Sequence, residues 1–413
     1  MHRRLALAWM MVLIGCAPAS SAGVDGKQPR APGPVLPGID VLLRDSLHLV
    51  RGRRVGLVTN QTGVDARGVS DVDRLRAAGV KLVALFSPEH GFRGAAEAGA
   101  AVVSSLDSAT GLPIYSLYGR VSAPTEPMLQ GVDLLLVDLQ DAGARYYTYI
   151  GTTIDVMAAA AGHGIRVVVL DRPDPIGGAV QGNVLDTAFR SSVGRLAVPM
   201  RHGLTLGELA RLARADLGLT TDLIVVPVAG WRRSLAWDDT GLPFVPPSPN
   251  LKSVEALFHY PGVCLFEGTA LSVGRGTGAP FEQIGAPWLD TSAVLARVRA
   301  ASLPGVRFAA VAFTPTRPGD GRFADTLVVG IRLSVTDRQT YDPTRTAVYL
   351  LSAVQAVHPD RIGWIPRHFD RLAGGRTLRE AIVAGQKPDD IVKGWQPGLR
   401  AYEAGRRRYL LYP

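Results

Sequence analysis

The sequence predicts an α/β fold in which a doubly wound parallel sheet is followed by a smaller α+β domain. Three observations support this prediction. Between residues 38 and 290, short apolar runs that suit buried strands alternate with helical patterns. Between residues 291 and 413, the order changes to a helix, two longer strands and a second long helix. The chain has 413 residues, of which 47% are hydrophobic, and this is enough for two cores.

The first elements are defined by apolar spacing and by the residues that interrupt it. Apolar side chains at helical spacing predict a helix over 38–50, and a strand is predicted at 54–59. A helix near 69–78 stops at Gly79, because glycine readily takes the left-handed conformation that ends helices. The next apolar run, 81–86, predicts the second strand.

The same signals predict the later elements. They are strands at 133–138, 166–170, 223–228, 307–313 and 326–335, and helices at 152–161, 205–217, 291–301 and 343–357. Thr205 and Glu208 have the spacing of a capping box, which supports a helix start there. The proline-rich segment 231–250 is predicted to be a long loop, and loops of this length are usually functional.

The N-terminus is predicted to be a lipoprotein signal peptide over residues 1–15. Basic residues precede an apolar run that is too short to remain as a membrane span, and the run ends in a pattern that resembles the bacterial lipobox. Cys16 would then be lipidated, anchoring the protein to a membrane in the periplasm or cell envelope. The alternative is an ordinary signal peptide cleaved near Ala22. Residues 16–37 are rich in Pro, Gly, Ala and Ser and are predicted to be a flexible tether.

Charge and cysteine content narrow the class of protein. The formal net charge is +9, but the basic residues are scattered and no aromatic and basic module of the nucleic-acid-binding kind is present. We therefore expect a solvated basic surface and no nucleic-acid partner. With Cys16 lipidated, Cys264 is the only free thiol, so there is no internal disulfide framework. Its apolar neighbours predict a buried strand and a core cysteine in preference to a catalytic thiol.

Four consecutive strands of the predicted sheet end in polar side chains. The pairs are Asn60-Gln61, Glu89-His90, Gln140-Asp141 and Asp171-Arg172. Pro88 ends the second strand sharply, because proline has no amide hydrogen for the sheet. Ligands of open α/β sheets bind beyond the carboxyl ends of the strands, so these groups are expected to line one crevice.

The motifs that the chain lacks narrow the class of ligand it could bind. The chain has neither the glycine-rich turn of dinucleotide sites nor a phosphate-binding loop, so no nucleotide cofactor is expected. Histidine and cysteine do not occur at zinc spacing, so no metal is expected. The remaining carboxylates, amides, guanidinium groups and aromatics suit a sugar, and cleaving a glycosidic bond needs carboxyl groups. The candidate carboxylates are Glu89, Asp141, Asp171, Glu267 and Glu282.

Eight motifs occur in order along the chain, at 59–63 (Thr-Asn-Gln-Thr-Gly), 87–91 (Ser-Pro-Glu-His-Gly), 138–149, 171–175, 247–250, 266–269 (Phe-Glu-Gly-Thr), 274–282 and 285–288. Together they resemble those of the bacterial exo-β-N-acetylmuramidases, and the resemblance extends from about residue 38 to residue 413. The resemblance implies a Rossmann-like domain over 38–290 and a smaller domain over 291–413. It also implies release of N-acetylmuramic acid from the non-reducing end of peptidoglycan fragments during wall turnover.

The resemblance maps the family's Glu-His pair onto Glu89 and His90 and its Glu-Gly-Thr glutamate onto Glu267, and together with the residue types it leads to the following expected roles. Glu89 would be the general acid, Glu267 the second carboxylate, and His90 and Asp141 would orient the acid or the sugar. The expected substrate-binding residues are Asn60, Gln61, Arg93, Gln140, Arg145, Tyr146, Tyr147, Asp171, Arg172, Arg201, His202, Asn250 and Arg275. Of these, Arg93, Arg145, Arg201 or Arg275 would pair with the lactyl carboxylate of muramic acid.

The chain departs from the family pattern at two positions. Val273 stands where many relatives have glutamate, so a carboxylate there cannot be essential to an active form of this protein. Asp174 stands where asparagine is common, a nearly isosteric change that adds charge. Two rival interpretations remain, a lipoprotein that binds muropeptides without cutting them and a different hydrolase such as an amidase or deacetylase. The stereochemical course is also open.

Overall fold

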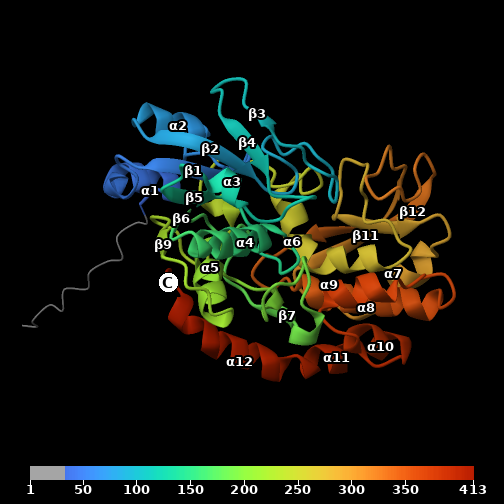
Figure 1. The fold of residues 1–413 in the computed structure, drawn as a ribbon. Coiled ribbons are helices and arrows are strands. Elements are labelled where there is room, and N and C mark those ends of the chain that lie inside the picture. The colour runs from blue at the N-terminus through green and yellow to red at the C-terminus, as the bar shows by residue number, and fades with distance from the viewer. Residues whose placement is uncertain (1–32) are drawn as a thin grey trace, which may run out of the picture. The chain divides into compact units, whose positions relative to one another are not determined.

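A seven-stranded sheet forms the centre of the N-terminal half of the computed structural model, which describes residues 33–413 (Figure 1). Cys16, the predicted signal peptide and most of the predicted tether lie outside the described residues. The strands are β1 (Arg54–Thr59), β2 (Lys81–Ser87), β3 (Ser105–Leu106), β4 (Pro113–Ser116), β5 (Leu134–Asp138), β6 (Arg166–Leu170) and β9 (Leu223–Val226). Their order is β3-β4-β2-β1-β5-β6-β9, and only the β3–β4 pair is antiparallel.

This strand order confirms the predicted doubly wound, Rossmann-like sheet. From β1 the chain winds outward through β2 to β4, and it then returns beside β1 to wind the other way through β5, β6 and β9. The direction reverses between β1 and β5. Loops that leave the two strands at such a point diverge and open a crevice beyond their carboxyl ends.

Alternate residues of each strand pack against helices on opposite faces of the sheet. Leu57 and Leu136 pack on the side of α1 (Gly38–Asp45) and α2 (Asp71–Ala77), whereas their neighbours Val58 and Val137 belong to the core on the other side. That second core contains α4 (Tyr149–Gly162) and α5 (Leu206–Asp216). Both faces are therefore covered, which explains why the strands are continuously apolar.

The C-terminal half contains an antiparallel sheet flanked by helices. Its strands are β10 (Gln283–Ala286), β11 (Val306–Phe313) and β12 (Val328–Val335), in the order β10-β12-β11. Its helices are α6 (Val254–Val263), α7 (Thr291–Ala300), α8 (Pro343–Val357), α9 (Pro366–Ala373), α10 (Thr377–Val383), α11 (Pro388–Gly394) and α12 (Gln396–Arg406). Short α3 (Glu126–Leu129) and the strands β7 (Gln181–Val184) and β8 (Pro199–Arg201) complete the elements used below.

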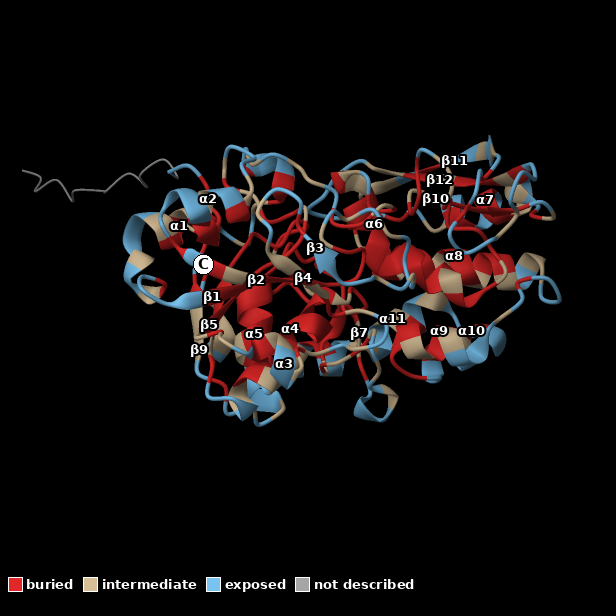
Figure 2. Cartoon of the chain, turned by 45° about the horizontal axis from the view of Figure 1, so that its top comes forward, coloured by how far each residue is buried: buried red, intermediate tan, exposed pale blue. Residues whose placement is uncertain are grey.

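Buried residues extend from the central sheet through α6 into α8 (Figure 2). The chain from Pro34 to Pro413 forms one compact unit, and the boundary predicted between residues 290 and 291 stays a prediction. No helix within residues 33–413 is long and apolar enough to cross a membrane. The strand predicted around Cys264 is wrong, because this residue begins a 3-10 turn, Cys264–Gly268, that continues α6. An apolar run buried on all sides has the same composition in a helix and in a strand.

Candidate active site

Glu89 occupies a strained turn directly after β2. The next residue, His90, has a φ of 69°, and Gly91 follows with a φ of 75°. This left-handed conformation is unfavourable for a non-glycine residue and persists only where surrounding contacts hold it. The His90 Nδ1 atom lies 2.7 Å from the carbonyl oxygen of Ala96 and is one such contact. The turn buries the Glu89 side chain, which is 7% exposed.

Two neutral donors hold the Glu89 carboxyl group. The Thr148 hydroxyl donates to Oε2 at 2.7 Å, and the Gly99 amide donates to Oε1 at 2.9 Å. Tyr118 lies close by, and burial followed by the charge of Glu89 raises the pKa of its phenol to about 12. Within residues 33–413, no arginine, lysine or histidine forms a salt bridge with Glu89. Its oxygens are fixed in place without a cationic partner.

Glu267 has a different environment, because it is ion-paired. The Arg275 guanidinium contacts its Oε1 atom at 2.7 Å and stacks 5.1 Å from the ring centre of Phe281. Burial alone would lower the pKa of the Arg275 guanidinium. The neighbouring Glu267 carboxylate more than compensates for burial, so the pKa is raised. The Cys264 thiol lies 3.4 Å from Oε2 of Glu267. Burial, and then the Glu267 charge, raise the pKa of this thiol well above its usual value.

Gly268 explains how Glu267 reaches its position. A Cβ atom at Gly268 would lie 2.5 Å from the Cα atom of Phe369 in α9, so the turn and the helix are in direct backbone contact. The Ile365 amide also donates to the Gly268 carbonyl at 2.8 Å, just before this helix begins. The Glu-Gly-Thr motif therefore sets a carboxylate beside α9.

Glu89 and Glu267 line the same cavity, which has a volume of about 160 Å³. Its other lining residues come from the turn after β2, α6 and its following turn, α9, and the loops that follow β4, β7 and the 3-10 turn or precede α4 and α6. They are His90, Ala98, Tyr118, Tyr146, Tyr147, Thr148, Ser192, Val193, Ser248, Leu251, Tyr260, Cys264, Arg275, Phe281, His368 and Leu372. Glu89 and Glu267 are the only carboxylates in this lining. Val273 is fully buried in the core and adds none.

The aromatic wall of this cavity is rigid. The Tyr146 hydroxyl donates to the Pro261 carbonyl, and the Tyr147 hydroxyl donates to the Pro247 carbonyl at 2.7 Å. Tyr260 packs edge-on against both rings, with centroids 5.6 and 6.3 Å away. Because the phenol groups are bonded to backbone, the rings offer the cavity their apolar surfaces and edges.

The predicted site residues divide into two groups. Six line the cavity: Glu89, His90, Tyr146, Tyr147, Glu267 and Arg275. Eleven do not: Asn60, Gln61, Arg93, Gln140, Asp141, Arg145, Asp171, Arg172, Arg201, His202 and Asn250. The expectation that all of these strand-end groups line one crevice therefore does not hold, because most are used inside the protein to fix loops.

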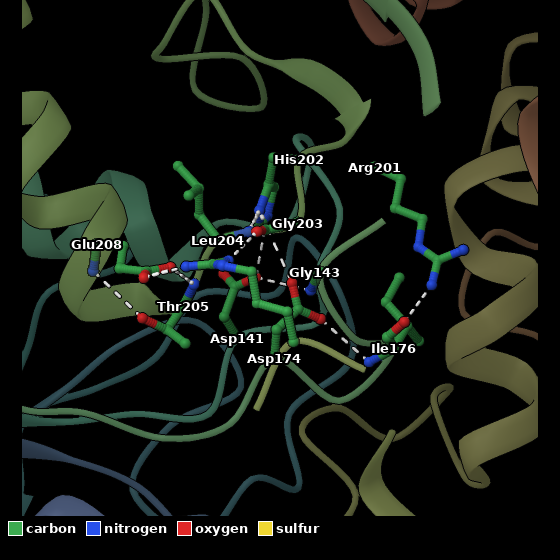
Figure 3. Close-up of polar contacts among 12 residues, drawn as sticks. Asp141, Gly143, Asp174, Ile176, Arg201, His202, Gly203, Leu204, Thr205 and Glu208 are labelled. Atoms are coloured by element: carbon green, nitrogen blue, oxygen red, sulfur yellow. Dashed lines mark hydrogen bonds and ion pairs between the residues drawn. The ribbon is translucent and has the colours of Figure 1, made fainter. Parts of the chain in front are cut away.

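A buried network around Asp141 contains several members of the second group (Figure 3). Asp141 accepts a hydrogen bond from the Gly143 amide at 2.7 Å, and Nε2 of His202 lies 3.3 Å from the same oxygen. Asp174 accepts from the Ile176 amide at 3.0 Å and lies 4.0 Å from Nδ1 of His202. The His202 contact with Asp141 has the distance but not the angle of a hydrogen bond, so it is an electrostatic contact.

The strand-end amides are also internal. Asn60 donates to the Tyr149 hydroxyl at 2.7 Å, Gln61 to the Pro246 carbonyl at 2.9 Å, and Gln140 to the Pro173 carbonyl at 2.9 Å. These bonds join the loops after β1, β5 and β6 to one another and to the proline-rich loop. The Asn60 amide thus positions Tyr149, which lies next to the Thr148 that holds Glu89.

Asp171 and Arg172, which follow β6, bond to other parts of the protein. Arg172 forms a buried ion pair with Asp138 at 2.5 Å. Asp171 accepts hydrogen bonds from the Thr205 hydroxyl at 2.7 Å and from the Gly207 amide at 2.8 Å, at the start of α5. Asp171 thereby fixes a helix N-terminus, where a negative charge is favourable.

Three further predicted residues have contacts away from the cavity. Arg201 bonds to Gln181 at 2.9 Å and to the Ile176 carbonyl, as Figure 3 shows for the second contact. Asn250 donates to Glu97 at 3.0 Å. Arg93 is 73% exposed and lies 3.5 Å from Asp107.

Arg145 holds α9 in place without lining the cavity. Its guanidinium donates to the carbonyls of Asn183 at 2.7 Å, of Val198 at 3.0 Å and of Leu372 at 3.0 Å. Leu372 lies in the last turn of α9, and its side chain lines the cavity. Burial lowers the pKa of Arg145 to about 10, and the buried charge is accommodated by these carbonyls. Arg145 therefore supports the helix that forms one wall.

We expect Arg145→Met to lower the free energy of unfolding by about 2 kcal/mol, because three buried carbonyls lose a charged donor while the volume stays filled. Urea unfolding followed by circular dichroism measures the loss. Arg367→Met, at an exposed position in the first turn of the same helix, is the control and should change stability by less than about 0.5 kcal/mol. Equal stabilities of the Arg145 variant and the control would contradict this supporting role.

Several cavity residues carry no clear signal in the amino-acid sequence. Tyr118, Thr148, Ser192 and His368 lie in segments without a strand-end signal, and the apolar run around Cys264 favours a core strand. Thr148 lies inside one of the eight motifs, and its position just before a helix is the available signal. His368 can be found only through the tertiary contact of α9 with the turn that carries Glu267.

Comparison with known proteins agrees with this geometry. Residues 55–255 match the family model for the N-terminal part of the exo-beta-N-acetylmuramidase NamZ, and residues 258–412 match the model for its C-terminal part. The chain is 41% identical over 406 residues to the peptidoglycan beta-N-acetylmuramidase NamZ of Bacillus subtilis, covering 97% of each protein.

Two crystal structures of DUF1343 family proteins from Bacteroides fragilis have the same fold. The first has a TM-score of 0.85 and 33% sequence identity, and the match covers 93% of this chain and 100% of that protein. The second has a TM-score of 0.76 and 32% sequence identity, and the match covers 92% of this chain and 99% of that protein. The sequence and structural matches both extend over the two halves that meet at the cavity. The chain belongs to the exo-beta-N-acetylmuramidase NamZ family.

Proposed function

We propose that this protein is an exo-acting glycoside hydrolase that releases N-acetylmuramic acid from the non-reducing end of peptidoglycan fragments. The observation that carries the proposal is the single cavity with two carboxyl groups in different environments. One is held by neutral donors and the other by an arginine. Glycosidic cleavage uses such a pair, with one group giving a proton and the other acting as a carboxylate.

Glu89 is the group suited to give the proton. Its oxygens are oriented by the Thr148 hydroxyl and the Gly99 amide, and no cation within the described residues holds it as a carboxylate. It would protonate the oxygen that leaves with the remainder of the glycan. Rigid aromatic rings on one side keep the sugar at a fixed position relative to this group.

Glu267 is the group suited to remain a carboxylate. Its ion pair with Arg275 and its contact with the Cys264 thiol fix both oxygens. Positive charge develops on the sugar ring in the transition state, and a fixed carboxylate on the cavity wall stabilises that charge or activates water. The two carboxyl groups come from opposite halves of the chain, so neither half contains a complete site.

The test is product analysis with a defined disaccharide that carries N-acetylmuramic acid at its non-reducing end. The expected products are the two free monosaccharides, identified by mass spectrometry. Disaccharides with N-acetylglucosamine at that end should remain uncut. Tight binding of the first disaccharide without release of sugar would instead favour a binding lipoprotein, and cleavage of an amide bond would favour the other class of hydrolase.

We also propose that the protein works at the cell envelope on a lipid anchor at Cys16. The support is the order of basic residues, apolar run and cysteine at the N-terminus, together with a proposed substrate that derives from the cell wall. Cys16→Ala expressed in the native host should move the protein from the membrane fraction to the soluble fraction. Equal membrane association of the variant and the parent would overturn the anchor at this residue.

A further inference from the structure

The proposed substrate differs from other amino sugars of the wall by its lactyl ether, which carries a carboxylate. An enzyme that selects this sugar needs a cationic group that is free to bind that carboxylate at the cavity. The four arginines expected for this task are otherwise occupied or distant. Arg145 and Arg201 donate to internal carbonyls, Arg275 is paired with Glu267, and Arg93 lies on the surface beside Asp107.

Arg371 meets the requirement. It lies on α9, three residues after His368 and one residue before Leu372, both of which line the cavity. Residues three apart share one side of a helix, and the contact between the Arg371 guanidinium and the His368 ring places Arg371 directly behind a residue of the cavity wall. Its side chain is half-buried, and no carboxylate among residues 33–413 lies within salt-bridge distance of it.

The only hydrogen bond of the Arg371 side chain among the described residues goes to His368. Its Nη2 atom lies 2.8 Å from Nδ1 of His368, and its Nε atom is buried without a partner. A guanidinium has only donors, so Nδ1 of His368 is the acceptor and the proton of the neutral ring lies on Nε2. The other N–H groups of the Arg371 guanidinium and the Nε2–H group of His368 therefore form a set of donors that have no acceptor among the described residues.

This set lies at the cavity, because His368 lines it together with Glu89, Tyr118 and Glu267. The charge of Arg371 acts on Tyr118, which is beside Glu89, and the charge of Glu267 acts on His368. Burial, and then Arg371, lower the pKa of His368, which favours its neutral form. His368 thus shares the cavity with both carboxyl groups, and Arg371 is bonded to it.

We propose that Arg371, together with the Nε2–H group of His368, binds the lactyl carboxylate and makes the enzyme selective for N-acetylmuramic acid. This inference depends on the proposed function for the substrate class. Arg371 is then a specificity residue: it holds a substituent of the sugar and takes no part in proton transfer. The Glu267 ion pair with Arg275 stays intact, because a separate arginine serves the substrate.

The test compares two p-nitrophenyl β-glycosides, one of N-acetylmuramic acid and one of its lactyl methyl ester. The parent protein should favour the acid over the ester in kcat/KM by about 10- to 100-fold, because a charge-assisted contact is lost in the ester. In Arg371→Met this preference should fall to about 1, through a loss on the acid and little change on the ester. Arg371→Lys keeps the charge without the fork of donors and should give an intermediate preference.

Arg367→Met is the matched control, since it removes an exposed arginine from the same helix and should keep the parent preference. Binding of free N-acetylmuramic acid and its methyl ester, measured by calorimetry, makes the same comparison without hydrolysis. A parent protein that hydrolyses or binds acid and ester equally would overturn the inference, as would an unchanged preference in folded Arg371→Met. Failure of the parent to release sugar from either glycoside would instead count against the proposed function, while the binding comparison would still decide the role of Arg371.

Discussion

Glu89→Gln should lower kcat for the disaccharide by about 100- to 10,000-fold, which is the range that general acid catalysis contributes. Glutamine has nearly the same shape: its oxygen can still accept from the Gly99 amide, and its NH2 group can donate to the Thr148 hydroxyl, which turns to accept. It has no proton to give to the leaving oxygen. The expected loss therefore comes from chemistry, with KM and stability nearly unchanged. Measuring sugar release by mass spectrometry gives kcat directly.

The choice of leaving group separates a general acid from a structural carboxylate. A p-nitrophenolate needs little protonation to depart, so Glu89→Gln should affect the nitrophenyl glycoside much less than the disaccharide. Glu267→Gln should slow both substrates by a similar factor, because the charge it stabilises develops on the sugar ring in each case. Glu126→Gln, on the exposed surface of α3, is the control and should match the parent. Equal losses on the two substrates for Glu89→Gln would remove Glu89 from the acid role.

The elements of the fold were largely predictable, because they depend on local patterns. The strand at 166–170 and the helix at 343–357 have the predicted bounds, and the predicted helix over 205–217 is observed as Leu206–Asp216 with Thr205 and Glu208 forming its capping box. Apolar runs with turn residues at their ends specify such elements without tertiary information. The short strands β3 and β4 were not predicted, since they lie at the sheet edge and lack an apolar run.

The site was less predictable, because strand-end polarity does not distinguish a ligand contact from an internal bond. Glu89 and Gln140 both follow strands, yet Glu89 lines the cavity and Gln140 joins two loops. Arg145 has the residue type of a carboxylate ligand, but it supports α9. The groups that complete the cavity, such as His368, come from helices distant in sequence. Their placement depends on the close contact at Gly268, which no local pattern reveals.

Asp174→Asn should stabilise the protein above neutral pH, and its effect should depend on pH in a defined direction. Burial, and to a smaller extent the charge of Asp141, raise the pKa of Asp174 against the opposing effects of His202 and Arg201, and the resulting pKa is about 7. In the unfolded chain this carboxyl group has an ordinary low pKa. Between the two values the folded protein holds a proton that the unfolded chain has released. The parent therefore loses stability as pH rises, until the folded-state pKa is passed.

Asparagine cannot titrate, so the variant escapes this loss. The difference in unfolding free energy between the variant and the parent should grow by about 3 kcal/mol between about pH 5 and about pH 8, and it should stay level above that. The reason is that a proton held only by the folded state costs about 1.4 kcal/mol of stability for each pH unit. Urea unfolding at several pH values measures the difference. Asp360→Asn, at an exposed aspartate, is the control and should show a constant difference. The change of this free-energy difference with pH is more informative than its absolute size, because any effect of the amide on packing is independent of pH. A flat difference would mean that Asp174 is already ionised in the folded protein at about pH 5, which would contradict its raised pKa.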